Sequence, residues 1–83
     1  MNDVQAKAHF RKVLNQKIKA TGIKVIVLAK LVGVSASQIT RWTQGDLMPD
    51  WQQFNRLLEV FGMEDSHFLG NSISENSYIK RFK

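Results

Sequence analysis

Four glycines divide most of this chain into short segments, each with the apolar spacing of a helix. Gly22, Gly33, Gly45 and Gly62 stand at the ends of these segments, and a glycine just past a helix accepts the left-handed conformation of a C-cap. Apolar residues recur within the segments at steps of three and four, the helical period. We find no strand long enough to make a sheet, no internal repeat and no domain linker. The sequence therefore predicts an all-α fold of four to five short helices.

The same glycines indicate where the expected helices end. We expect helices over residues 3–20, Val25–Val32, Ala36–Gln44 and from Trp51 to Gly62, and a short fifth turn or helix over residues 64–69. Ser35 is the expected N-cap of the third helix, and Asp46 or Asp50 that of the fourth. Pro49 is expected near the start of the fourth helix, where its missing N–H costs nothing. The residues expected to face inward are Phe10, Val13, Leu14, Ile18, Ile23, Leu28, Val34, Ile39, Trp42, Trp51, Phe54, Leu57, Leu58 and Phe61.

Length and composition bound the class of protein. A chain of 83 residues buries only roughly 60–65 % of its unfolded surface, which leaves no room for a second core. The absence of cysteine excludes disulfides and thiolate zinc ligands and fits a reducing compartment. No apolar run approaches the about 18–20 residues of a membrane span, and the start lacks a signal-peptide pattern. We therefore expect a soluble, cytoplasmic protein.

The charge of +5 is unevenly distributed. Residues 1–30 carry one acid, Asp3, against the bases Lys7, Arg11, Lys12, Lys17, Lys19, Lys24 and Lys30. Residues 46–69 carry five acids against Arg56. Such a field would turn a basic face towards a polyanion, although a basic helix that is simply solvated has the same composition.

The most informative spacing lies in residues 25–45, VIVLAKLVGVSASQITRWTQG. Ala29 is followed four residues later by Gly33 and six further on by Ile39. This segment resembles the helix-turn-helix of the phage repressor-like family, the Cro and lambda repressor type (XRE). The resemblance continues through Gly45 and Pro49 into the following helix and covers most of residues 10–69.

The resemblance implies a lambda repressor-like helical bundle that binds double-stranded DNA. It gives Ala29 the close helix crossing, Gly33 the turn and Ile39 the wedge between the two helices. In a narrower form, GVSASQITRW followed by a proline and a Leu-rich helix is similar to the short phage activators that establish lysogeny. Whether the protein represses or activates stays open at this point.

The chain departs from the family pattern at the start of the motif. Lys24 and Val25 stand where the family usually has a Ser or Thr cap and a Gln that reaches a phosphate. Ile26, Val27 and Leu31 are apolar where the family tends to be polar, so something must cover that surface. The candidates are the first helix, the C-terminal tail or a second subunit.

The resemblance also implies which residues meet DNA. A major groove about 12 Å wide accepts one helix, whose expected contacts are Ser35, Ala36, Ser37, Gln38, Thr40, Arg41 and Gln44, with Lys24 and Lys30 on backbone phosphates. Ala36 would touch a thymine methyl, Gln38 would pair with adenine, and Arg41 would pair with guanine or clamp a phosphate. The alternative is that Gln38 and Thr40 are solvated helix residues and that Arg41 is a surface salt-bridge partner.

One helix contacts only about four to six base pairs, so we expect at least a homodimer. Residues 1–70 form the expected DNA-binding domain, and residues 71–83 a polar and basic tail that either oligomerises or is disordered. A helical tail would align Tyr78, Ile79 and Phe82 in an apolar stripe. RNA polymerase is a further candidate partner.

Other classes of function find little support. His9 and His67 are far apart and lack ligand-like spacing, and the scattered acids stand where loops and caps carry them anyway. We therefore expect no catalysis, no metal and no cofactor. The alternative function is a protein-binding module that contacts another regulator or polymerase. A membrane-interface helix is weaker, because the core needs the apolar face of the first helix.

Overall fold

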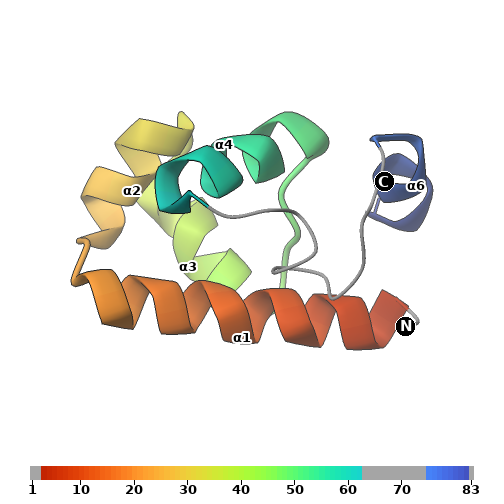
Figure 1. Cartoon of the computed structure of the whole chain (residues 1–83), viewed down its shortest axis with the longest axis horizontal. Helices are drawn as coiled ribbons and strands as arrows, with labels where there is room; N and C mark the ends of the chain where they lie inside the picture. The colour runs from red at the N-terminus through yellow and green to blue at the C-terminus, as the bar shows by residue number, and fades with distance from the viewer. Residues whose placement is uncertain (1–2, 63–74, 83) are drawn as a thin grey trace.

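The computed structural model describes residues 3–62 and 75–82, and helices are the only regular elements in these two ranges. They are α1 (Asp3–Thr21), α2 (Val25–Val32), α3 (Ala36–Gln44), α4 (Trp51–Phe61) and α6 (Glu75–Phe82). Figure 1 shows α1 along one side of the molecule, with α2, α3 and α4 packed over it and α6 at the end away from α2. The predicted all-α fold is confirmed, and the turn expected over residues 64–69 lies outside the described residues.

The helix ends follow the predicted glycines. Gly33 has φ 86°, a conformation that costs a residue with a Cβ about 1–2 kcal/mol. The N–H groups of Gly33 and Val34 both donate to the carbonyl of Ala29, at 2.8 and 2.9 Å. These two hydrogen bonds to one carbonyl end α2 and turn the chain towards α3 within two residues.

The N-caps resolve the alternatives that the sequence left open. Ser35 caps α3, accepting from the Gln38 N–H at 3.2 Å. Asp50 rather than Asp46 caps α4, accepting from the Gln53 N–H at 2.8 Å. Pro49 lies immediately before this cap and is buried, so its place is just outside the helix.

One hydrophobic core joins all five helices. Its buried members are Ala6, Phe10, Leu14, Leu28, Ala29, Val32, Ile39, Trp42, Phe54, Leu57 and Tyr78. Phe54 lies at the centre, with ring centroids 6.2 Å from Phe10, 5.9 Å from Trp51 and 5.0 Å from Tyr78. Burying one such side chain contributes about 1.5–3 kcal/mol, so Phe54 links α1, α4 and α6 energetically.

The expected tail contributes to this core, which neither sequence alternative foresaw, and its part in oligomerisation stays a prediction. Residues 75–82 form α6, so the disordered alternative is wrong for that range. Tyr78 is 2 % exposed and its hydroxyl donates to the Pro49 carbonyl, so it is not part of a surface stripe. Ile79 remains 36 % exposed, whereas the side chain of Phe82 lies outside the described residues. The spacing of Tyr78, Ile79 and Phe82 predicts an apolar stripe, but it does not indicate which surface the stripe packs against.

The burial of Tyr78 predicts an alkaline transition. Burial raises the pKa of the phenol, and the Asp50 carboxylate raises it further. Above the ordinary pKa of 10.0, the unfolded chain releases the phenolic proton while the folded chain keeps it. The unfolded state then binds fewer protons, so the free energy of unfolding falls as the pH rises.

This is the only tyrosine in the chain, so tyrosinate absorbance reports it alone. We expect the phenol to ionise only together with helix loss in circular dichroism, and Tyr78→Phe to remove the absorbance change. Ionisation near pH 10 with the helices intact would mean that α6 does not bury Tyr78.

No helix among the described residues combines the length and the apolar character needed to cross a membrane.

Candidate nucleic-acid interface

The turn between α2 and α3 fixes which side of α3 faces outward. Leu28, Ala29, Ile39 and Trp42 are buried, which confirms their predicted inward positions, and Val34 is half-buried. Since Ile39 and Trp42 lie three residues apart on one face of α3, the opposite face is turned away from the core.

The predicted contact residues occupy this outer face and its cap. Ser35, Ser37, Thr40, Arg41 and Gln44 are exposed, whereas Ala36 and Gln38 are half-buried. The structure thus gathers all seven predicted residues of this segment along α3. Their contact with DNA stays a prediction.

Gln38 already has a structural role in the cap of α3. Its side-chain oxygen accepts from the Ser35 N–H at 3.1 Å, while the Gln38 N–H donates to the Ser35 hydroxyl at 3.2 Å. This reciprocal pair is a capping box. The predicted bidentate pairing with adenine uses the same oxygen, so it would compete with the cap.

The hydroxyl groups on α3 are also directed to local partners. Thr40 donates to the Ala36 carbonyl at 3.1 Å, and the Ser35 and Ser37 hydroxyls lie 3.1 Å apart. The side chains of Arg41 and Gln44 make no hydrogen bond or ion pair to any other residue described. Arg41 and Gln44 are therefore the long polar side chains that α3 presents ready for an external partner.

The start of α2 is basic and lacks a side-chain cap. Lys24 stands at the N-cap with extended backbone and makes no side-chain cap hydrogen bond, as expected from the missing Ser or Thr. The first N–H groups of a helix lack intrahelical partners and carry a partial positive charge. With the exposed Lys24 beside them, they favour an anion such as a phosphate.

Arg11 and Asn15 of α1 hold the end of α3, a role that the sequence did not indicate for either residue. Asn15 donates to the Thr43 carbonyl at 3.0 Å and to the Arg11 carbonyl at 2.8 Å. The Arg11 guanidinium donates to the Gln44 carbonyl at 3.5 Å. The bonds to Thr43 and Gln44 satisfy carbonyls that the end of α3 leaves unpaired. Because they join residues 28 and 33 positions apart, no local pattern indicates them.

Gly45 makes room for this contact. Its φ is 81°, and a Cβ at this position would come within 3.2 Å of the Arg11 side chain. The glycine therefore serves both the left-handed end of α3 and the close approach of α1.

Replacing Asn15 with alanine should loosen the end of α3. We expect a loss of about 0.5–1.5 kcal/mol in the free energy of unfolding, the usual net value of a hydrogen bond. Urea unfolding measures it, and Gln16→Ala on the exposed side of α1 is the matched control. Equal losses for the two variants would contradict a specific role of Asn15.

The exposed charges are partly separated along the molecule. Lys24, Lys30 and Arg41 lie on or beside α2 and α3, and Asp50, Glu59 and Glu75 lie on or beside α4 and α6. The exposed Asp46 after α3, Arg56 on α4 and Lys80 on α6 depart from this separation. Within residues 3–62 and 75–82, no group of three or more His, Asp or Glu side chains is arranged to hold a metal ion.

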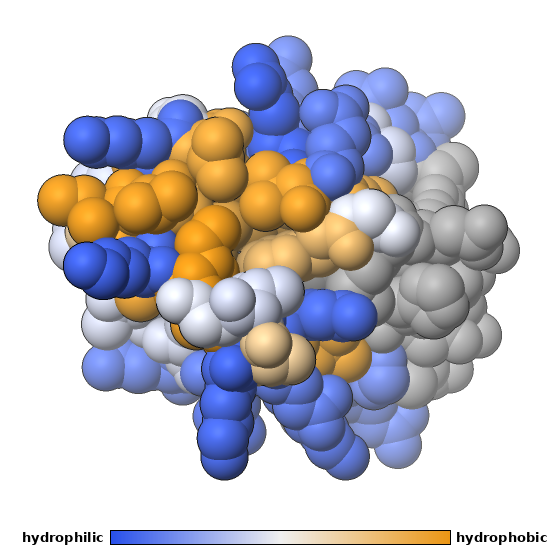
Figure 2. All heavy atoms as spheres, turned by 60° about the vertical axis from the view of Figure 1, so that its left-hand side comes forward, coloured by the Kyte–Doolittle hydropathy of each residue, from blue (hydrophilic) through white to orange (hydrophobic). Residues whose placement is uncertain are grey.

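An apolar patch covers the outer side of α2. The α2 patch consists of Ile26, Val27 and Leu31, which are 58 %, 43 % and 50 % exposed. Figure 2 shows apolar atoms gathered on this side, bordered by hydrophilic residues. Neither α1 nor the described part of the tail covers the patch, since α6 lies at the other end of the molecule (Figure 1). Of the three candidates expected to cover this surface, α1 and the described part of the tail are therefore excluded, and a second subunit is left.

These features define a helix-turn-helix domain of the kind found in DNA-binding regulators. A family profile described as "Helix-turn-helix domain" matches residues 17–68, more than half of the chain. The chain belongs to this helix-turn-helix family, which is of the XRE-like type. In comparisons with curated proteins and with solved structures, nothing matches this chain.

Proposed function

We propose that this protein binds a specific double-stranded DNA site and regulates transcription there as a homo-oligomer. The observation that carries the proposal is α3 itself. Its inner face is locked into the core by Ile39 and Trp42, while its outer face offers Arg41 and Gln44 without described partners. A rigid helix with one buried and one polar face is what a major groove admits.

The geometry supports a division of work among the contact residues. Arg41 has the length and the planar guanidinium for bidentate pairing with guanine O6 and N7. Gln44 lies one turn nearer the end of the helix, three residues from Arg41. Lys24 and Lys30, together with the Ser35 and Ser37 hydroxyls, would position the protein on phosphates. Ala36, Gln38 and Thr40 would line the groove, with Gln38 holding the cap.

The protein would regulate transcription by occupying its DNA site. Bound at an operator or promoter, the protein would either exclude RNA polymerase or touch it, and it would need neither catalysis nor a cofactor. The resemblance of GVSASQITRW to the phage lysogeny-activator group supports a phage or prophage gene and a promoter as the site.

The α2 patch favours a second candidate function, a module that binds another regulator or polymerase. An exposed apolar surface of this kind marks a protein contact. Titrating the protein with random duplex at low salt separates the two candidates. A DNA-binding protein gives affinity that falls steeply with salt, whereas a pure protein binder gives none.

Lys24→Ala tests the phosphate contact. We expect affinity for all duplex sequences to fall by a similar factor, and the slope of log K against log salt to drop by about 1, because one phosphate contact is lost. Gel-shift titrations over a range of salt measure both. Lys19→Ala, an exposed lysine near the end of α1, is the control. A loss confined to one sequence would contradict the assignment.

A further inference from the structure

We propose that the α2 patch of one copy docks into a pocket between α4 and α6 of the next copy, so that the protein associates head to tail. This inference rests on the proposed oligomeric function and names its contact. It uses the two ends of the molecule and shares only Lys30 with the proposed DNA contacts, so that Lys30 would pair with a carboxylate of the next copy in place of a phosphate.

The α2 patch is apolar and has one cation, Lys30, beside it on the same face of the helix. Lys30 lies four residues after Ile26 and three after Val27, so the three share the outer face of α2. Leu31 lies four residues after Val27 and extends the patch along the helix. The surface is therefore complementary to an apolar hollow that carries a carboxylate.

Pairing of two α2 patches with each other is disfavoured. A two-fold contact would place each patch against its own copy, which puts the Lys30 side chains of both copies in one contact. Like charges in such a contact are destabilising. The positive charge of Lys30 therefore favours a different, acidic surface as the partner of the α2 patch.

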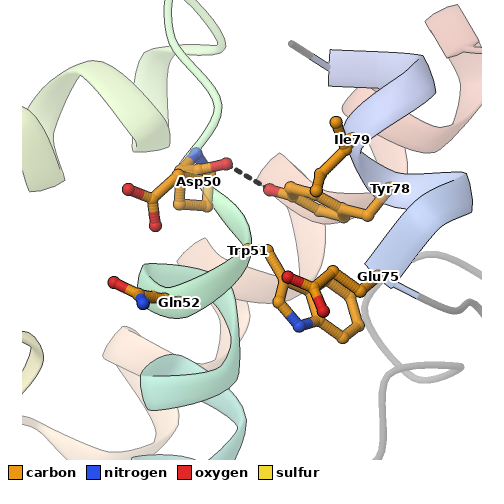
Figure 3. Close-up of a pocket in the computed structure, with 7 residues that line it drawn as sticks. Asp50, Trp51, Gln52, Glu75, Tyr78 and Ile79 are labelled. Carbon is orange, nitrogen blue, oxygen red and sulfur yellow. Dashed lines mark hydrogen bonds between the residues drawn. The ribbon is translucent and has the colours of Figure 1, made fainter.

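The pocket between α4 and α6 has the required chemistry. Pro49, Trp51, Tyr78 and Ile79 supply its apolar lining, Glu75 supplies a carboxylate, and Asp50 and Gln52 also line it, around a volume of about 350 Å³. Figure 3 shows the Glu75 carboxylate beside Trp51 and Ile79 above the Tyr78 ring. Lys80 lies on the far side of α6 in helical register, so the pocket wall that α6 provides is acidic and apolar.

The positions of the two surfaces decide the kind of assembly. The α2 patch and α6 lie at opposite ends of the long axis of the molecule (Figure 1). A contact between unlike surfaces at opposite ends repeats in one direction instead of closing into a dimer. The molecule is 30 Å long, and side chains extend this towards the roughly 34–36 Å of one DNA turn. Neighbouring copies therefore fit direct repeats about one turn apart.

Two exposed substitutions test the contact without DNA. Leu31→Asp removes the patch and Ile79→Asp removes the pocket wall. Leu31 is 50 % and Ile79 36 % exposed and neither belongs to the buried core, so circular dichroism should show folded chains. Sedimentation velocity at roughly 10 µM to 1 mM chain suits a weak contact of this size. We expect the wild-type chain to associate beyond the dimer as concentration rises, and each variant to stay monomeric.

The mixture of the two variants is the decisive sample. Leu31→Asp keeps an intact pocket and Ile79→Asp keeps an intact patch, so an equimolar mixture should form dimers that grow no further. In the same way, Lys30→Glu and Glu75→Lys should each weaken association roughly two- to fivefold, and their mixture should regain part of it.

Three outcomes would overturn the head-to-tail contact. They are a wild-type chain that stays monomeric throughout, an Ile79→Asp chain that still dimerises, and a mixture of the two Asp variants that stays monomeric. The first would assign the α2 patch to another protein, and the second to a two-fold contact. Binding of Leu31→Asp to a single DNA site tests the proposed function separately, because Leu31 is not among the DNA contacts.

Discussion

Phe54→Ala is expected to lower the free energy of unfolding by about 3–5 kcal/mol, the cost of deleting a buried aromatic ring. The ring is fully buried and lies against Phe10, Trp51 and Tyr78, so its loss leaves a cavity where α1, α4 and α6 meet. An 83-residue domain has only about 4–12 kcal/mol in total, at roughly 0.05–0.15 kcal/mol per residue. Chemical denaturation followed by circular dichroism measures the loss.

The matched control removes apolar atoms from the surface. Ile26→Ala should change stability by less than about 0.5 kcal/mol, because the side chain is 58 % exposed. If Phe54→Ala cost no more than Ile26→Ala, the core described for this protein would be wrong.

Arg41→Ala is expected to lose about 1–3 kcal/mol of binding free energy on the specific site, roughly 5- to 150-fold in affinity. The physical reason is that the side chain projects from the outer face of α3 and makes no hydrogen bond or ion pair with another described residue. On random duplex the loss should be small. Competition gel shifts with both duplexes at one salt concentration measure the difference.

Arg56→Ala is the control for Arg41, since it removes the same charge from an exposed position on α4. It should leave the preference for the specific site unchanged. Equal losses on specific and random DNA for Arg41→Ala would make Arg41 a phosphate contact and move sequence recognition to other residues of α3.

The helices and the heart of the core could be predicted because their signals are local. Gly33 ends α2 and Ser35 caps α3 through bonds within a few residues. The steps from Ile39 to Trp42 and from Phe54 to Leu57 place buried residues on one face without any knowledge of the partner helix. The uncapped start of α2 was foreseeable for the same reason, from Lys24 alone.

Contacts between distant segments were not predictable. The hydroxyl of Tyr78 bonds to Pro49, 29 residues away, and Asn15 bonds to Thr43. Both depend on how helices pack, which a periodic pattern does not specify.

Gln38 shows another limit of sequence reasoning. Its type suits base recognition, yet Ser35 three residues earlier recruits the same side chain into a capping box. The spacing of Ser35 and Gln38 is the signature of a capping box. The sequence alone thus supports both roles of Gln38, the cap and the DNA contact, and does not choose between them.

Selection of bound duplexes from a randomised pool, at about 150 mM salt where nonspecific binding is weakened, tests the central claim most directly. We expect enrichment of a defined half-site by the wild-type chain and a relaxed preference at one position for Arg41→Ala. A wild-type chain that enriches no sequence over the starting pool would contradict the assignment of α3 as a DNA-reading helix.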